Sequence, residues 1–92
     1  MQVPEEFKYL VQCFWQGSDR EAAGELDWIK RALKLNTPQQ QAVVKRYLTE
    51  LLDSTAGVAE LQNAWKSGSS GYLLRDEHIR WFFTQIRDAI KV

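Results

Sequence analysis

The segment PEEFKYLVQCFWQGSDRE, residues 4–21, predicts the first helix of the fold and the point where that helix ends. Pro4 is suited to a first helical position, and the two glutamates after it oppose the positive end of the helix dipole. Glycine tolerates the left-handed conformation that often follows a last turn, so we expect the helix to end at Gly17. The apolar side chains follow the spacing i, i+3, i+4, i+7 of one buried helix face: Phe7, Leu10, Val11 and Phe14.

The end of this predicted helix is unusually rich in large side chains. Phe14 and Trp15 stand next to each other, and Cys13 precedes them on the flank of the apolar face. Large rings supply much buried area per residue, which helps a chain of 92 residues to complete a core. We therefore expect Phe14 and Trp15 to close one end of the core.

Four more helices are predicted after Gly17. Ser18 to Glu21 and Thr37 to Gln40 both have the pattern of a capping box, so one helix should begin at Ser18 and another at Thr37. Breaks near Gly57 and in the Gly/Ser loop at 66–72 separate the last two. The expected inward-facing residues are Ala22, Leu26, Trp28, Ile29, Ala32 and Leu33, then Val43, Val44, Tyr47, Leu48, Leu51 and Leu52, then Val58, Leu61, Ala64 and Trp65, and finally Ile79, Phe82, Phe83, Ile86 and Ile90. The sequence thus predicts an all-α fold, a single small domain over residues 1–92 with a bundle of about five helices.

The residue types offer little for catalysis or for a cofactor. A structural zinc site needs three or four ligands, and besides carboxylates the chain has only Cys13 and His78. The same two residues are the only candidates for a thiol–imidazole pair, and no nucleophile motif or Walker loop surrounds them. A single cysteine excludes an intrachain disulfide. We expect no enzyme activity, no cofactor and no metal.

No apolar run approaches the 18 residues of a membrane span, and the first residues lack a basic stretch followed by an apolar one. These features predict a cytoplasmic protein without a membrane partner.

Charge is balanced overall, with 12 basic and 12 acidic residues, but it is banded along the chain. One band, residues 28–46, is basic, and its Lys30, Arg31, Lys34, Lys45 and Arg46 are the side chains that a nucleic-acid-binding domain would use. Acidic bands lie on both sides of it. Their carboxylates are candidates for binding a basic protein partner, or else they form solvated helix faces: Asp19, Glu21, Glu25 and Asp27, then Glu50, Asp53 and Glu60.

Two residues conflict with the predicted helix faces. Trp81 projects about 160° away from the apolar face of the last helix, so it is either covered by a second layer or exposed as a partner anchor. Glu25 projects into the apolar face of the second helix, so either the first turns of that helix overhang the core or Glu25 faces a basic partner.

At CFWQG and at RWFFTQIRDAI the chain resembles the immunity proteins of contact-dependent growth inhibition systems (the CdiI type). In that family the first helix ends in two aromatic residues followed by His, Gln and Asp, which fall here on Phe14, Trp15, Gln16 and Gly17. Also similar are a Leu-rich middle helix (YLTELLD), a Gly/Tyr loop (GSSGY) and a last helix with Trp81, Phe82 and Ile86.

The resemblance implies a small helical protein that binds and neutralises the toxic C-terminal domain of a cognate effector, with Trp81 covered by a second layer. Toxins of such systems often attack nucleic acids, so the implied partner is a protein toxin domain, such as a nuclease, and not a nucleic acid itself. The residues alone are equally compatible with a small helical adaptor or regulatory domain, and less so with a nucleic-acid-binding domain.

Overall fold

The structure, a computed structural model, describes residues 2–15 and 17–92, and within them it contains five α-helices, one short 3₁₀-helix and no β-strand. This confirms the all-α fold of about five helices in one small domain. None of the described helices combines the length and the apolar content that crossing a membrane requires. The elements are α1 (Glu5–Gln12), the 3₁₀-helix η1 (Ser18–Glu21), α2 (Glu25–Leu33), α3 (Pro38–Asp53), α4 (Val58–Lys66) and α5 (Asp76–Ala89).

The start of α3 is fixed as its sequence predicts. The hydroxyl oxygen of Thr37 accepts a hydrogen bond from the backbone N–H of Gln40 at 3.1 Å, and the side-chain oxygen of Gln40 accepts one from the N–H of Thr37 at 2.7 Å. Pro38 occupies the first helical position, where no N–H is needed. The capping box at residues 37–40 is therefore confirmed.

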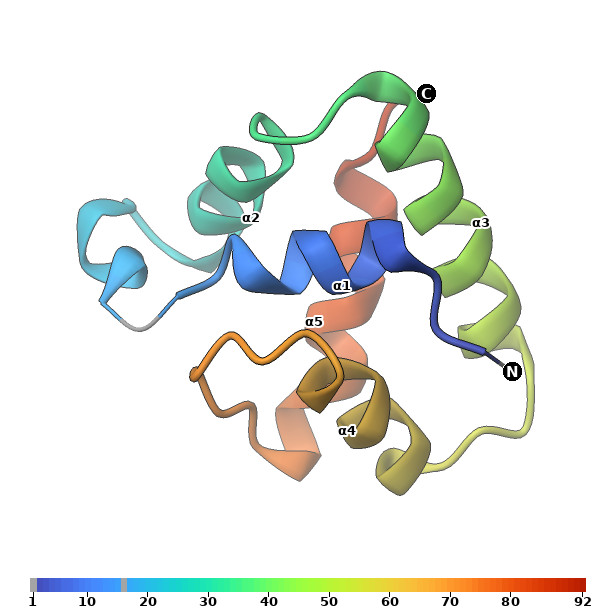
Figure 1. Ribbon diagram of the computed structural model, residues 1–92. Helices are drawn as coiled ribbons and strands as arrows, with labels where there is room; N and C mark the ends of the chain where they lie inside the picture. The colour runs from blue at the N-terminus through green and yellow to red at the C-terminus, as the bar shows by residue number, and fades with distance from the viewer. Residues whose placement is uncertain (1, 16) are drawn as a thin grey trace.

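Helix α5 lies at the centre of the bundle, with α1 crossing it and α2, α3 and α4 arranged around it (Figure 1). The crossing of α1 and α5 is filled by Phe7 and Phe83, whose ring centres are 5.5 Å apart in an edge-to-face arrangement. The C-terminus returns to α3, where Lys45 Nζ donates to the carbonyl oxygen of Val92 at 3.2 Å. Every helix thus contributes to one core.

Phe14 is the centre of an aromatic cluster at one end of that core. Its ring lies 4.9 Å from Trp28, 5.4 Å from Phe82 and 5.6 Å from Trp65, measured between ring centres. The side chain is fully buried. The prediction that Phe14 closes one end of the core is confirmed.

The same prediction is wrong for Trp15, which is 50 % exposed. Helix α1 ends at Gln12 and not at Gly17, so the chain leaves the helix before the two rings are reached. The bend that turns Phe14 into the core leaves its neighbour Trp15 on the outside. Gly17 does adopt the left-handed conformation, with φ of 96°, but it precedes η1 and does not end α1. Gln16, which the family resemblance includes, lies outside the described residues.

The predicted helix start at Ser18 is also wrong. Ser18 begins the short 3₁₀-helix η1, the chain is irregular over residues 22–24, and α2 begins only at Glu25. Leu26, expected to face inward, lies in the first turn of α2 and is exposed. Two further residues expected to face inward are exposed, namely Val43 and Val58.

The loop after α4 is held against α1 by a glycine. A Cβ atom at Gly68 would lie 2.4 Å from Cβ of Val11 and 2.9 Å from the carbonyl oxygen of Lys8, so only glycine allows this approach. The loop therefore leaves α4 at a fixed position on the surface, and this determines where the following residues, Gly71 to Leu73, are presented.

Candidate functional site

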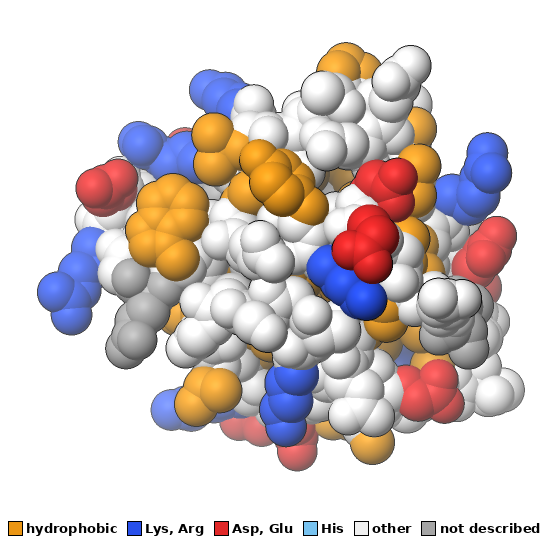
Figure 2. All heavy atoms as spheres, viewed as in Figure 1, with side chains coloured by type: hydrophobic (Ala, Val, Ile, Leu, Met, Phe, Trp, Pro, Cys, Tyr) orange, Lys and Arg blue, Asp and Glu red, His pale blue; other side chains and the backbone are white. Residues whose placement is uncertain are grey.

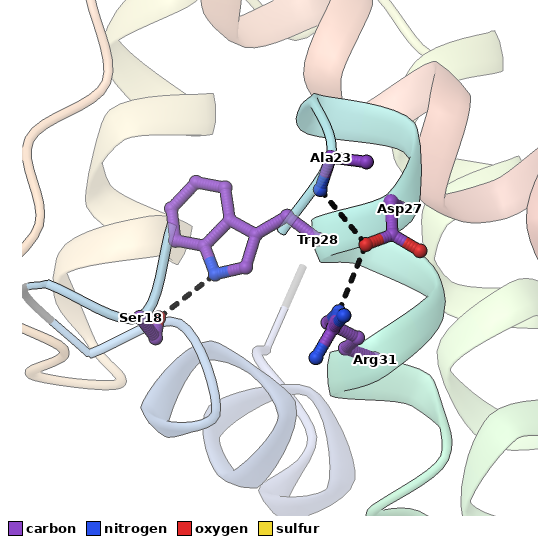
Figure 3. A network of polar contacts seen from close by, with 5 residues as sticks. All are labelled: Ser18, Ala23, Asp27, Trp28 and Arg31. Carbon is purple, nitrogen blue, oxygen red and sulfur yellow. Dashed lines mark hydrogen bonds and ion pairs between the residues drawn. The ribbon is translucent and has the colours of Figure 1, made fainter. Parts of the chain in front are cut away.

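The first acidic segment, residues 18–27, is held in place by one buried indole. Trp28 Nε1–H donates to Ser18 Oγ at 2.8 Å, and the Ser18 hydroxyl donates to the carbonyl oxygen of Trp15 at 2.7 Å (Figure 3). The hydroxyl that the capping box needs is therefore used by Trp28. This explains why residues 18–21 form a short 3₁₀-helix and why a regular helix does not begin there.

The start of α2 is fixed by a side chain from inside the helix. The Oδ2 atom of Asp27 accepts the backbone N–H of Ala23 at 3.0 Å and the Nε–H of Arg31 at 2.8 Å (Figure 3). These two bonds, that from Ala23 first, lower the pKa of the Asp27 carboxyl. Asp27, a candidate partner contact in the sequence, therefore stabilises the local fold.

Tyr72 is brought to the same place from the loop between α4 and α5. Its ring packs edge-to-face on Trp28, with ring centres 4.7 Å apart. Its backbone is held as well, since its carbonyl oxygen accepts Trp65 Nε1–H at 2.8 Å. A tyrosine 44 residues away from Trp28 in sequence thus joins η1 and the start of α2.

Two open cavities meet at this tyrosine. The larger, of about 550 Å³, is lined by Gly17, Asp19, Arg20, Gly71, Tyr72 and Leu73. The smaller, of about 190 Å³, is called the acidic notch below, and it is lined by Asp19, Gly24, Glu25, Trp28 and Tyr72. Asp19 and Tyr72 line both cavities. The acidic notch therefore combines two carboxylates from different elements with two aromatic side chains.

The electrostatics of Tyr72 reflect this arrangement. Burial raises the pKa of its hydroxyl, and the nearby carboxylates of Asp19 and Glu25 raise it further because they disfavour a third negative charge. The two carboxylates therefore act on the same point, and a cation placed between them would interact with both.

The surface continues from the acidic notch to α5. Glu25 Oε2 and His78 Nε2 are 2.6 Å apart, and the His78 ring stacks on Trp81 with 4.8 Å between ring centres and an angle of 27°. Trp81 remains 41 % exposed. The expectation of a ring covered by a second layer is wrong, because only the histidine one turn earlier on α5 is stacked on it. Glu25 likewise faces outward and not into the core.

The structure thus brings together three of the eight candidate residues: Asp19, Glu25 and Trp81. Glu21 lies elsewhere, in a cavity of about 190 Å³ whose lining includes Trp15, Arg31 and Leu35. The second acidic band lies on other elements. Its members are Glu50 and Asp53 on α3 and Glu60 on α4, and the last of these is near Tyr47, whose pKa is raised by burial and then by that carboxylate.

Cys13 and His78 have different partners. The Cys13 thiol donates to the carbonyl oxygen of Tyr9 at 3.4 Å, and burial raises its pKa, which lowers its reactivity. His78 is engaged with Glu25 and Trp81. Over residues 2–15 and 17–92, no three side chains of His, Cys, Asp or Glu are grouped in a way that would hold a metal ion.

Sequence reasoning missed Tyr72, Leu73 and His78 as members of this surface. Leu73 carried the clearest signal, since it is an apolar residue directly after a Gly/Ser loop and is 82 % exposed. The contacts of Tyr72 and His78 depend on the irregular residues 22–24, which direct α2 away from η1, and no helical pattern predicts them.

Comparisons with protein-family models, with curated proteins and with solved structures found no match to this chain.

Proposed function

We propose that this protein is an immunity protein that binds the C-terminal toxin domain of a cognate contact-dependent growth inhibition effector and neutralises it by stoichiometric binding. The observation that carries the proposal is the meeting of Asp19 and Glu25 at Tyr72, beside the exposed ring of Trp81. Exposed aromatic residues next to fixed charges are typical of protein-binding surfaces. The family resemblance of the sequence supplies the class of partner.

The mechanism follows from charge. Enzymes that act on nucleic acids have basic clefts, because the substrate is a polyanion. A protein that presents carboxylates to such a cleft associates quickly and occupies the place of the phosphates. Asp19 and Glu25 supply the carboxylates here, and Trp81, stacked on His78, supplies an apolar contact next to them. Hydrophobic side chains are also exposed over the end of α1 and beside α2 (Figure 2), which offers further area for a partner.

The test uses two variants with the same change of charge. Asp19→Lys with Glu25→Lys alters the acidic notch, whereas Glu50→Lys with Asp53→Lys alters exposed positions on α3. Cells that produce the toxin domain encoded beside this gene are scored for survival with each variant. We expect the first pair to lose protection and the second to retain most of it, with circular dichroism showing that both fold.

Equal protection by the Asp19/Glu25 variant and the parent would contradict binding through the acidic notch. Failure of the parent protein to bind any product of the adjacent locus would contradict the immunity function itself.

A further inference from the structure

We propose that the acidic notch is the receptor for one arginine side chain of the partner protein, whose guanidinium lies between the carboxylates of Asp19 and Glu25 and against the Tyr72 ring. The inference rests on the proposed function, since it names the residue type by which the same surface recognises its partner.

The charges of the notch select a single cation. Its lining contains two carboxylates and no basic side chain, whereas the larger cavity beside it also contains Arg20. Within the described part of the chain, the Asp19 carboxylate makes no hydrogen bond or ion pair, and Glu25 uses only Oε2, toward His78. Carboxylate oxygens of both residues are therefore available to a donor from outside.

The aromatic side chains favour arginine over lysine. A guanidinium is planar, stacks on aromatic faces and donates to two carboxylates at once through its fork of N–H groups. Tyr72 is fixed for such stacking by its contact with Trp28 and by the hydrogen bond from Trp65 to its backbone. Lysine would satisfy the charge but would use neither the plane nor the fork.

The surroundings of the notch favour a protein as the source of this arginine. Leu73 lines the adjoining cavity and is 82 % exposed, so an apolar side chain next to the incoming arginine would cover it. A nucleic acid is disfavoured, because its phosphates would be repelled by Asp19 and Glu25.

The experiment uses the full ¹⁵N-labelled chain and three capped tripeptides, Gly-Arg-Gly, Gly-Lys-Gly and Gly-citrulline-Gly. Citrulline keeps the shape of arginine without its charge. Chemical shifts of the Trp28 indole N–H and of the backbone amides of Asp19, Gly71 and Tyr72 are followed at low ionic strength. We expect saturable shifts with the arginine peptide, with a dissociation constant on the order of millimolar, at least a severalfold weaker response to lysine, and none to citrulline.

Two variants complete the test. Asp19→Asn should abolish the arginine response while keeping the size of the side chain, and Glu50→Gln, which makes the same change on α3, should leave it unaltered. An equal response to all three peptides, no saturable shift with the arginine peptide, or an unchanged response in Asp19→Asn would overturn the inference.

The outcome is separate from that of the survival assay. If Asp19→Asn loses the arginine response but the parent still protects cells from the toxin, the immunity function stands whatever the contact that the notch makes. If the parent binds the arginine peptide but no toxin domain, the arginine site stands and its partner belongs to another class.

Discussion

Residues 18–21 and residues 37–40 carry the same capping pattern but adopt different structures. At Thr37 the reciprocal hydrogen bonds form and a helix of 16 residues follows. At Ser18 the hydroxyl is bonded to Trp28 and Trp15, and only a 3₁₀-helix of four residues forms. A local pattern therefore specifies a helix start only when no buried donor from elsewhere in the fold needs the same side chain.

This difference creates the candidate site. Had a regular helix begun at Ser18, Asp19 and Glu25 would lie six residues apart on one helix, about 120° from an eclipsed arrangement. The irregular residues 22–24 instead place the two carboxylates around Tyr72. The competition for the Ser18 hydroxyl is therefore the physical origin of the acidic notch.

The largest expected effect concerns the ring beneath the first of these two segments. Phe14→Ala removes the wall against which Trp28 packs, 4.9 Å away, and leaves a cavity among Trp28, Trp65 and Phe82. We expect the free energy of unfolding to fall by about 3–5 kcal/mol. Denaturant titration measures this change, and a loss below about 1 kcal/mol would show that Phe14 is not part of the core.

Replacing the contested hydroxyl is expected to have the next largest effect. Ser18→Ala leaves the buried Trp28 N–H without its acceptor, which should lower the free energy of unfolding by about 1–3 kcal/mol. The indole N–H resonance of Trp28 should shift as well. If the variant were as stable as the parent and a regular helix formed over residues 18–24, competition for Ser18 would not explain the break.

Thr37→Ala is the matched change at the segment that does form a capping box. It should cost about 0.5–2 kcal/mol, because the cap lies at an exposed helix end and water can replace part of it. Hydrogen exchange should quicken at the amides of Gln40 and Gln41, while the Trp28 indole signal stays unchanged. A shift at Trp28 would mean that the two segments are coupled.

The smallest effect is expected from Asp27, which is largely solvated. Its pKa is lowered in the folded protein from the ordinary value of 3.8, so its stabilisation is complete above that value and is lost as the pH falls through the folded pKa. Asp27→Asn should therefore lower stability slightly at neutral pH and hardly at all in strong acid. Thermal unfolding of both proteins across this range tests the sign, and a difference that grows in acid would contradict it.

The sequence predicted the helices and most of the core because period and capping are local properties. Phe7, Phe14 and Ile79 could be assigned to the interior from spacing alone. Trp15 could not, because its direction depends on a bend before Gly17 that no apolar period records. Tyr72 and His78 were missed for the same kind of reason, since their contacts join segments far apart in the chain.

The central claim is that the protein binds its partner through the acidic notch and the adjoining face of α5, and not through the second acidic band. Hydrogen exchange of the complex with the toxin domain tests it most directly. We expect added protection at residues 17–25, 71–73 and 78–81, with residues 50–60 unchanged. Protection confined to residues 50–60, with none at the acidic notch, would contradict the claim.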